Sequence, residues 1–269
     1  MSDLHTSDTE SMLIFDFDGV LLNSVVEMSI TAYNTVTGGL ATSPDDLPGN
    51  AAELFVTNRY HVQPAGDAIN LMTWCIDNAG LPGDHRLEPE EYLAIREASD
   101  VPLKERTVSF FAGRKRLVAQ DPVQWASLNT VYQPVWDVLK GQDAEGIVIL
   151  TNKNREATVT LCHHFGLAVR EGNVYSGDNG TTKIENLLEI RARFGRERYG
   201  FVDDSIGNLE ELDAHFNRDE PLLELMLASW GYIGPDDHAA ARRAGFAIYK
   251  QADLIARVTS MKGVELGSS

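Results

Sequence analysis

Four short apolar runs along the chain are typical of fully buried β-strands. They are residues 12–15, 147–150, 199–202 and 222–227. Their apolar residues do not alternate with polar ones, as expected for strands that are covered on both faces. The pattern therefore predicts an α/β fold with a parallel sheet and helices on both faces of it.

Helix signals separate the later apolar runs. Asn154 is a good N-cap for a helix that ends near Gly166. Thr182 opens a capping box, and Gly195 is placed to end the helix that follows it. Ser205 is placed to cap a third helix. Strand and helix thus alternate, which is the pattern of βαβ units.

The segment between the first and second apolar runs has a different character. It shows helical periodicity and several Pro/Gly breaks, and it contains no convincing buried strand. We expect an all-α domain of residues 23–133, inserted directly after the first strand. The sheet domain would then consist of residues 1–22 and 134–269, and Pro134 suits the first turn of its next helix.

Polar residues follow three of the predicted strands. Ligands of open parallel sheets bind at the carboxyl ends of the strands, so these residues are candidates for a site. Any one of the three groups alone is typical of a turn or a helix cap. The groups are Asp16, Asp18 and Gly19 after the first strand, Thr151, Asn152 and Lys153 after the second, and Asp203, Asp204 and Ser205 after the third.

The four aspartates of these groups require a cation if they converge. Two unit charges about 4 Å apart repel by about 4 kcal/mol at an effective dielectric constant near 20. The candidate ligands Asp16, Asp18, Asp203 and Asp204 offer only oxygen, and no His or Cys stands nearby at metal-binding spacing. This donor set favours Mg²⁺ over Zn²⁺. Lys183, in the first turn of its helix, adds an anion site.

These residue types together suit phosphoryl transfer through an aspartyl-phosphate. Asp16 would attack phosphorus, and Asp18 would protonate the leaving oxygen and then activate water. Mg²⁺ and Lys183 would offset the repulsion between Asp16 and the phosphate, while Thr151 would hold a nonbridging oxygen. The predicted phosphate-binding residues are Gly19, Thr151, Asn152 and Lys183.

A basic cluster, Arg114-Lys115-Arg116, stands out within the predicted insertion. A solvated helix face is the simplest interpretation. The alternative is that Arg114 binds a second anionic group of the substrate, either a carboxylate or a phosphate.

Composition restricts the remaining function classes. The 269 residues include 40 acidic and 23 basic side chains, a net charge of −17, which disfavours nucleic-acid binding. No apolar run reaches the roughly 18 residues of a membrane span, and residues 1–11 lack the features of a secretory signal. Two cysteines are too few for a disulfide framework, so we expect a cytoplasmic protein.

The motifs resemble those of the haloacid dehalogenase superfamily. Residues 13–21 resemble its first motif, Thr151 the second, Lys183 the third and residues 203–208 the fourth, in the family's order. The resemblance implies a Rossmann-like catalytic core, a helical cap inserted after the first motif and a Mg²⁺-dependent phospho-aspartate mechanism. It also implies that Asp18 binds the metal through its backbone carbonyl, and that Asp203 and Asn208 lie in or next to the coordination sphere.

Within the superfamily, Asp18 indicates a phosphatase or a phosphomutase, because the dehalogenase branch lacks this aspartate. Residues 230–232, Trp-Gly-Tyr, are similar to the phosphoglycolate phosphatase branch. We therefore expect hydrolysis of a small phosphorylated metabolite. A phosphomutase of the β-phosphoglucomutase type remains an alternative, since such members also have valine at the position of Val20. A binding or regulatory protein that keeps the fold without turnover is the third alternative.

Overall fold

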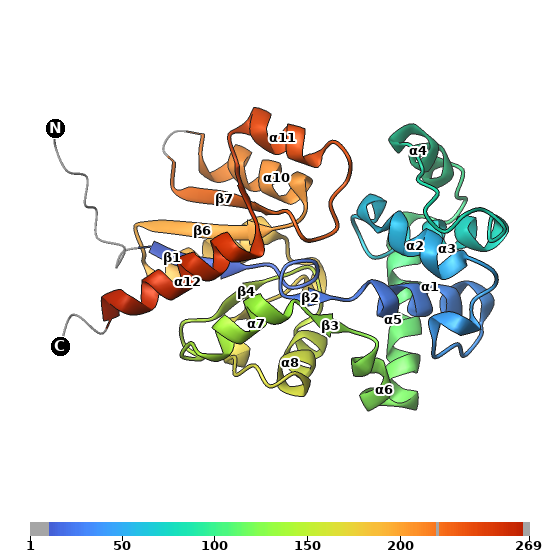
Figure 1. Ribbon diagram of the computed structural model, residues 1–269, viewed down its shortest axis with the longest axis horizontal. Coiled ribbons are helices and arrows are strands. Elements are labelled where there is room, and N and C mark those ends of the chain that lie inside the picture. The colour runs from blue at the N-terminus through green and yellow to red at the C-terminus, as the bar shows by residue number, and fades with distance from the viewer. Residues whose placement is uncertain (1–10, 219–220, 266–269) are drawn as a thin grey trace. The chain divides into compact units, whose positions relative to one another are not determined.

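The computed structural model describes residues 11–218 and 221–265, with side chains up to 261. The predicted lack of a secretory signal concerns a segment that lies largely outside the described residues. The chain divides into two compact units. One reaches Leu22 and resumes at Val131, and the other comprises Asn23–Thr130 (Figure 1).

The first unit contains a six-stranded sheet in which neighbouring strands are parallel. Its order is β5 (Val174–Tyr175), β4 (Val148–Leu150), β1 (Ser11–Phe15), β6 (Arg198–Asp203), β7 (Leu223–Ala228) and β8 (Ala247–Tyr249). The four predicted strands are confirmed as β1, β4, β6 and β7. The two edge strands were not predicted; β5 has only two residues, too few to form a recognisable apolar run.

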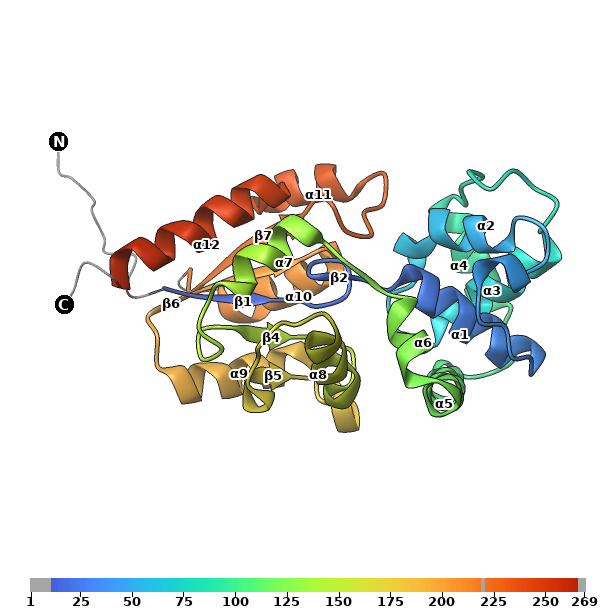
Figure 2. The same cartoon turned by 60° about the horizontal axis from the view of Figure 1, so that its bottom comes forward.

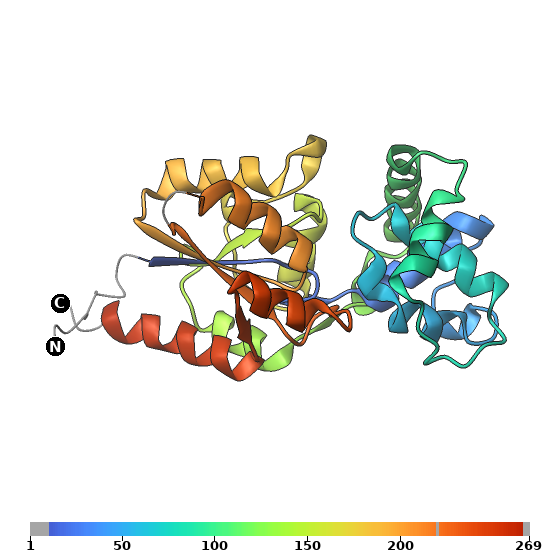
Figure 3. The same ribbon diagram turned by 90° about the horizontal axis from the view of Figure 1, so that it is seen from above.

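Helices cover both faces of this sheet, as predicted. Figure 3 shows α9 and α10 on one face and α7 and α12 on the other, and α7 lies beside α12 in Figure 2 as well. On the first face, side chains of α9 and α10 form one buried apolar cluster with the strands. The helices are α7 (Gln133–Lys140), α8 (Arg155–His164), α9 (Lys183–Phe194), α10 (Ile206–Phe216), α11 (Asp237–Ala244) and α12 (Gln251–Glu265).

The predicted helix starts are confirmed at atomic detail. The Asn154 side chain accepts a hydrogen bond from the backbone N–H of the third residue of α8. Thr182 and Glu185 form a reciprocal capping box at the start of α9, and Gly195 ends that helix in the left-handed conformation. Ser205 caps α10. Local sequence therefore determines where the helices begin that present Lys183 and the residues after Asp203.

In the second unit, the regular elements within residues 24–129, all of which are described, are helices, and loops connect them. In it α1 packs against α2, α3 and α5. Two-residue strands, β2 (Leu22–Asn23) and β3 (Thr130–Val131), form a small sheet where the chain passes between the units. The helices are α1 (Val25–Thr37), α2 (Ala51–Thr57), α3 (Asp67–Asp77), α4 (Pro89–Glu97), α5 (Leu103–Gln120) and α6 (Pro122–Ser127).

Arg114 of α5 is buried, with 5% of its surface exposed, so the expectation of a solvated helix face is wrong for this residue. Its Nε and Nη2 donate to the carboxylate of Glu27 at 2.8 and 2.6 Å. Trp125 Nε1 and Thr31 Oγ1 donate to the same carboxylate. The cause is the close approach of α1 and α5: a Cβ on Gly113 would lie 2.1 Å from a threonine hydroxyl of α1. Arg114 thus forms an ion pair with a residue of its own unit.

Cys75 and Cys162 are buried free thiols, and burial raises the pKa of each to about 12. None of the described helices combines the length and the apolar composition that a membrane-spanning helix needs.

Candidate active site

Three neighbouring strands of the sheet end in polar residues at the same edge. β1 lies between β4 and β6, and Phe15 at the end of β1 pairs with Val202 of β6. The next residue, Asp16, donates its backbone N–H to the Val202 carbonyl at 2.9 Å. Asp16, Thr151 and Asp203 therefore meet at the carboxyl edge of the sheet, where the sequence placed them.

A cluster of three carboxylates forms the centre of this edge. Asp16, Asp203 and Asp204 are buried, and one carboxylate oxygen of each lies within 4.8 Å of the other two. Charges this close repel strongly unless a cation lies among them. Because all the donors are oxygens of buried carboxylates, the cluster fits a hard divalent cation such as Mg²⁺.

Lys183 provides one positive charge to the cluster. Its Nζ donates to Asp16 Oδ1 at 2.9 Å and to Asp203 Oδ2 at 2.7 Å. The ammonium group also lies 5.0 Å from the centre of the Phe201 ring. The capping box at the start of α9 fixes the first turn that carries this lysine. Lys183 therefore connects two of the three carboxylates.

The electrostatics of Asp16 and Lys183 reflect this crowding. Burial raises the pKa of Asp16 well above its usual value of 3.8; Lys183 opposes the rise, and the charges of Asp203 and Asp204 add to it. Burial on its own would lower the pKa of Lys183, but the charges of Asp16 and Asp203 outweigh it and raise that pKa above its usual value. The lysine is therefore charged at neutral pH, and Asp16 resists ionisation until a further cation arrives.

Asp203 uses both carboxylate oxygens within the chain. Oδ1 accepts from the backbone N–H of Ser205 at 2.8 Å. Oδ2 accepts from Lys183 and also from Asn208 Nδ2 at 3.0 Å. Asp203 and Asn208, which the family resemblance placed near the metal, thus form one hydrogen-bonded group that holds the lysine.

Lys153 belongs to the same edge, although sequence reasoning assigned it no role. Its Nζ lies 3.2 and 3.3 Å from the two carboxylate oxygens of Asp18. The lysine side chain is only 1% exposed, and that of Asp18 is 17% exposed. A signal was present in the sequence: Lys153 follows Thr151 by two residues, at an edge with four carboxylates and one other predicted cation.

The predicted phosphate-binding residues occupy different environments. Thr151 is buried, and its hydroxyl accepts from the Lys153 backbone N–H at 3.1 Å. The side chain of Asn152 is exposed beside it. Gly19 has a φ of +88°, and a Cβ there would lie 2.0 Å from Asp204 Oδ2. The turn after β1 therefore requires glycine for its conformation and for the space that Asp204 occupies.

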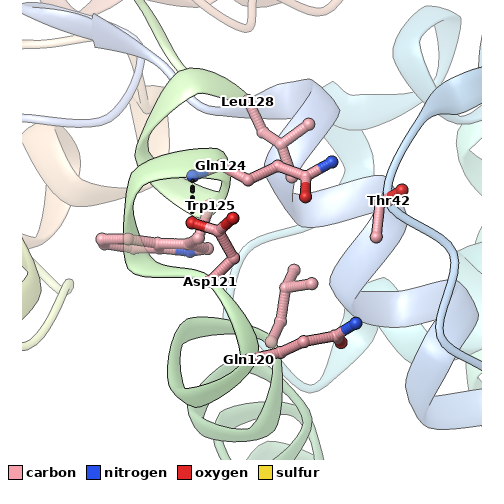
Figure 4. Close-up of a pocket in the computed structure, with 7 residues that line it drawn as sticks. Thr42, Gln120, Asp121, Gln124, Trp125 and Leu128 are labelled. Carbon is pink, nitrogen blue, oxygen red and sulfur yellow. Dashed lines mark hydrogen bonds between the residues drawn. The ribbon is translucent and has the colours of Figure 1, made fainter.

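A depression in the helical unit does not have the chemistry of a phosphate site. It is shallow and opens to solvent (Figure 4). Asp121, the N-cap of α6, lines it and accepts from the Gln124 backbone N–H at 2.9 Å, and none of the lining residues is basic. They are Thr42, Leu117, Gln120, Asp121, Gln124, Trp125 and Leu128.

Comparisons with known proteins identify the fold. No family model and no curated protein sequence matches the chain. A predicted phosphatase from Clostridium acetobutylicum is similar in structure, with a TM-score of 0.57 and 12% identity over 93% of this chain and 99% of that one. A predicted phosphoglycolate phosphatase from Haemophilus somnus has a TM-score of 0.54 and 16% identity, over 93% and 98%.

A conserved haloacid dehalogenase-like protein of unknown function from Agrobacterium tumefaciens has a TM-score of 0.52 and 15% identity, over 94% and 99% of the two chains. At such low identity the likeness concerns the fold. The protein therefore has the Rossmann-like α/β fold of haloacid dehalogenase-like proteins, as the motifs implied. Unlike its fold, its activity has to be argued from the site.

Proposed function

We propose that the protein is a Mg²⁺-dependent phosphatase that hydrolyses a small phosphorylated metabolite in the cytoplasm through a phospho-aspartate on Asp16. The observation that carries the proposal is the buried cluster of Asp16, Asp203, Asp204 and Lys183 at the ends of adjacent parallel strands. Similar structures described as phosphatases support it.

The reaction needs a nucleophile and a proton carrier. A carboxylate oxygen of Asp16 attacks phosphorus, and the bond from phosphorus to the ester oxygen breaks. Asp18 gives its proton to the departing oxygen. It then takes a proton from water as the water oxygen attacks phosphorus, which releases inorganic phosphate and restores Asp16.

Other residues hold the phosphoryl group and its charge. The Thr151 hydroxyl is placed at the Asp16 edge to donate to a nonbridging oxygen. The ammonium group of Lys183, already 2.9 Å from Asp16, offsets the charge that gathers between the nucleophile and the phosphate. Lys153 holds the Asp18 carboxylate while it is ionised.

The donor set supports a Mg²⁺ site among these carboxylates. Asp16 and Asp204 would hold it through their carboxylates and Asp18 through its backbone carbonyl, with Asp203 next to them. Bound there, Mg²⁺ supplies positive charge that neutralises the carboxylates and the phosphate dianion.

The deciding experiment is phosphate release from a panel of small phosphomonoesters, phosphoglycolate among them, with Mg²⁺ and with EDTA. We expect release that requires Mg²⁺. Analysis of the organic product separates the alternatives, since an isomeric phosphate without free phosphate identifies a mutase. No turnover of any substrate, or release that EDTA leaves unchanged, would reject the proposal.

The raised pKa of Asp16 predicts competition between protons and Mg²⁺. Only the ionised carboxylate attacks phosphorus, and the proton is held to a higher pH than in an ordinary aspartate. We expect the acid limb of the kcat/KM profile to move to lower pH as the Mg²⁺ concentration rises. The substrate is titrated separately at each concentration as a control. An acid limb that does not respond to Mg²⁺ contradicts the prediction.

Substitution of Lys153 is expected to impair the proton carrier. Lys153→Met leaves the Asp18 carboxylate without its ion-pair partner, and we expect kcat to fall about tenfold or more with a smaller change in KM. Lys153→Arg should recover part of the loss, and Lys140→Met, which removes an exposed lysine of α7, serves as the matched control. A raised KM with unchanged kcat would show instead that Lys153 contacts only the substrate.

A further inference from the structure

The segment that follows β7, here called the Trp-Gly-Tyr segment (residues 230–232), contacts two loops of the candidate site. Trp230 Nε1 donates to the carbonyl of Val20 in the turn after β1 at 3.0 Å. The backbone N–H of Tyr232 donates to Asp204 Oδ2 at 2.6 Å. The segment therefore joins the turn that follows the nucleophile to the carboxylate at the end of β6.

Gly231, between these two donors, leaves space that Asp204 fills. A Cβ on Gly231 would lie 2.3 Å from Asp204 Cβ, 2.6 Å from Asp204 Oδ2 and 2.6 Å from the carbonyl oxygen of Gly19. A Cβ on Gly19 would lie 2.0 Å from Asp204 Oδ2. The Asp204 side chain is thus confined between two glycines that lie far apart in the sequence.

We propose that the Trp-Gly-Tyr segment positions Asp204 for the divalent cation, an inference that rests on the metal site of the proposed function. Asp16 is oriented by the flexible side chain of Lys183. Asp204, like Asp203, accepts from a backbone N–H. A backbone donor and two glycine contacts restrict the rotation of the carboxylate before the cation binds. Less conformational freedom is then lost on binding, which increases affinity.

Contacts that orient a metal ligand without touching the metal typically change affinity by 10- to 100-fold. Gly231→Ala tests the glycine contact directly. Gly231 does not have a left-handed φ, so its backbone accepts alanine and the penalty comes from the collision with Asp204 and Gly19. The substitution is therefore a steric probe of the space that Asp204 and the Gly19 carbonyl share.

The experiment measures Mn²⁺ binding to the full-length protein, using the electron paramagnetic resonance signal of the free ion. We expect Gly231→Ala to bind Mn²⁺ 10- to 100-fold more weakly than the wild type. Gly146→Ala is the matched control, because a Cβ there meets only the Asp143 carbonyl at an ordinary 3.5 Å. Circular dichroism verifies that each variant is folded.

Two further variants keep the test decisive if Gly231→Ala fails to fold. Trp230→Phe keeps an aromatic ring and removes the donor to Val20, and we expect Mn²⁺ affinity to fall several-fold. In an Asp204→Asn background, Trp230→Phe and Gly231→Ala should cause little further loss, because the ligand they position is already changed.

Unchanged Mn²⁺ affinity in folded Gly231→Ala and Trp230→Phe overturns the inference, whatever the phosphatase assay shows. A wild type that binds Mn²⁺ but releases no phosphate rejects the proposed hydrolysis, and weakened binding by the two variants still supports the positioning role. A wild type that binds no Mn²⁺ overturns the metal site and the inference together.

Discussion

Asp16→Asn is expected to abolish phosphate release, lowering kcat by about 10⁴-fold or more, because the amide cannot attack phosphorus. The other two carboxylates of the cluster are held by hydrogen bonds: Asp203 accepts from Ser205, Lys183 and Asn208, and Asp204 accepts from the backbone N–H of Tyr232. Asp18 lies two residues further on and faces Lys153.

The same substitution is expected to leave stability unchanged or to raise it when Mg²⁺ is absent. Burial and the neighbouring carboxylates disfavour the charge on Asp16 more than Lys183 favours it. The neutral amide keeps the shape of the side chain and removes this unfavourable charge. A loss of activity with no loss of folding stability is expected for a catalytic group, because active-site residues commonly lower the stability of the folded protein.

Phosphate release and urea denaturation, measured on the same preparations, check both parts of this prediction. Asp137→Asn, an exposed position on α7, is the matched control and should resemble the wild type in both. Wild-type activity in Asp16→Asn would refute the nucleophile assignment. Lost activity together with a large drop in stability would show misfolding instead.

Arg114→Met is expected to lower the free energy of unfolding by about 3 to 5 kcal/mol, the usual cost of breaking a buried ion pair by removing one partner. Both side chains of the pair are buried, and two nitrogens of Arg114 contact the Glu27 carboxylate. Without the guanidinium group, the buried Glu27 carboxylate loses the two charged hydrogen bonds of Arg114 and keeps those from Trp125 and Thr31.

A double-substitution cycle tests this assignment. Glu27→Gln with Arg114→Met should cost less than Arg114→Met alone, because no unpaired charge remains. Lys115→Met, at the exposed neighbouring position, should change stability by no more than about 0.5 kcal/mol. If Arg114→Met keeps wild-type stability and raises KM, the alternative interpretation, in which Arg114 binds an anionic group of the substrate, is supported instead.

Most of the candidate site could be predicted because the information for it is local. Asp16, Thr151 and Asp203 each follow an apolar run, and parallel strands bring such positions together. Lys183 was found through the capping box that starts its helix. In each case a short stretch of sequence determines where a strand or helix begins or ends. The geometry of a parallel sheet then brings these positions together at one edge.

The partners of these residues could not be predicted, because they come from distant parts of the chain. Lys153 contacts Asp18 from 135 positions away. Arg114 carries the same charge as its exposed neighbours Lys115 and Arg116, and only the packing of α5 on α1 determines which of the three is buried. Periodicity indicates that a helix has two faces, but it does not say what lies opposite each face.

The sequence by itself determined the class of fold and the residues at the strand ends, since apolar runs, caps and polar ends are properties of neighbouring positions. Only the tertiary structure decided how those residues are held. Asp204 lies between Gly19 and Gly231, and Lys183 donates to both Asp16 and Asp203. The physical reason is that hydrogen bonds, ion pairs and close contacts depend on distances in space. Folding sets those distances, and it brings together residues that lie far apart along the sequence.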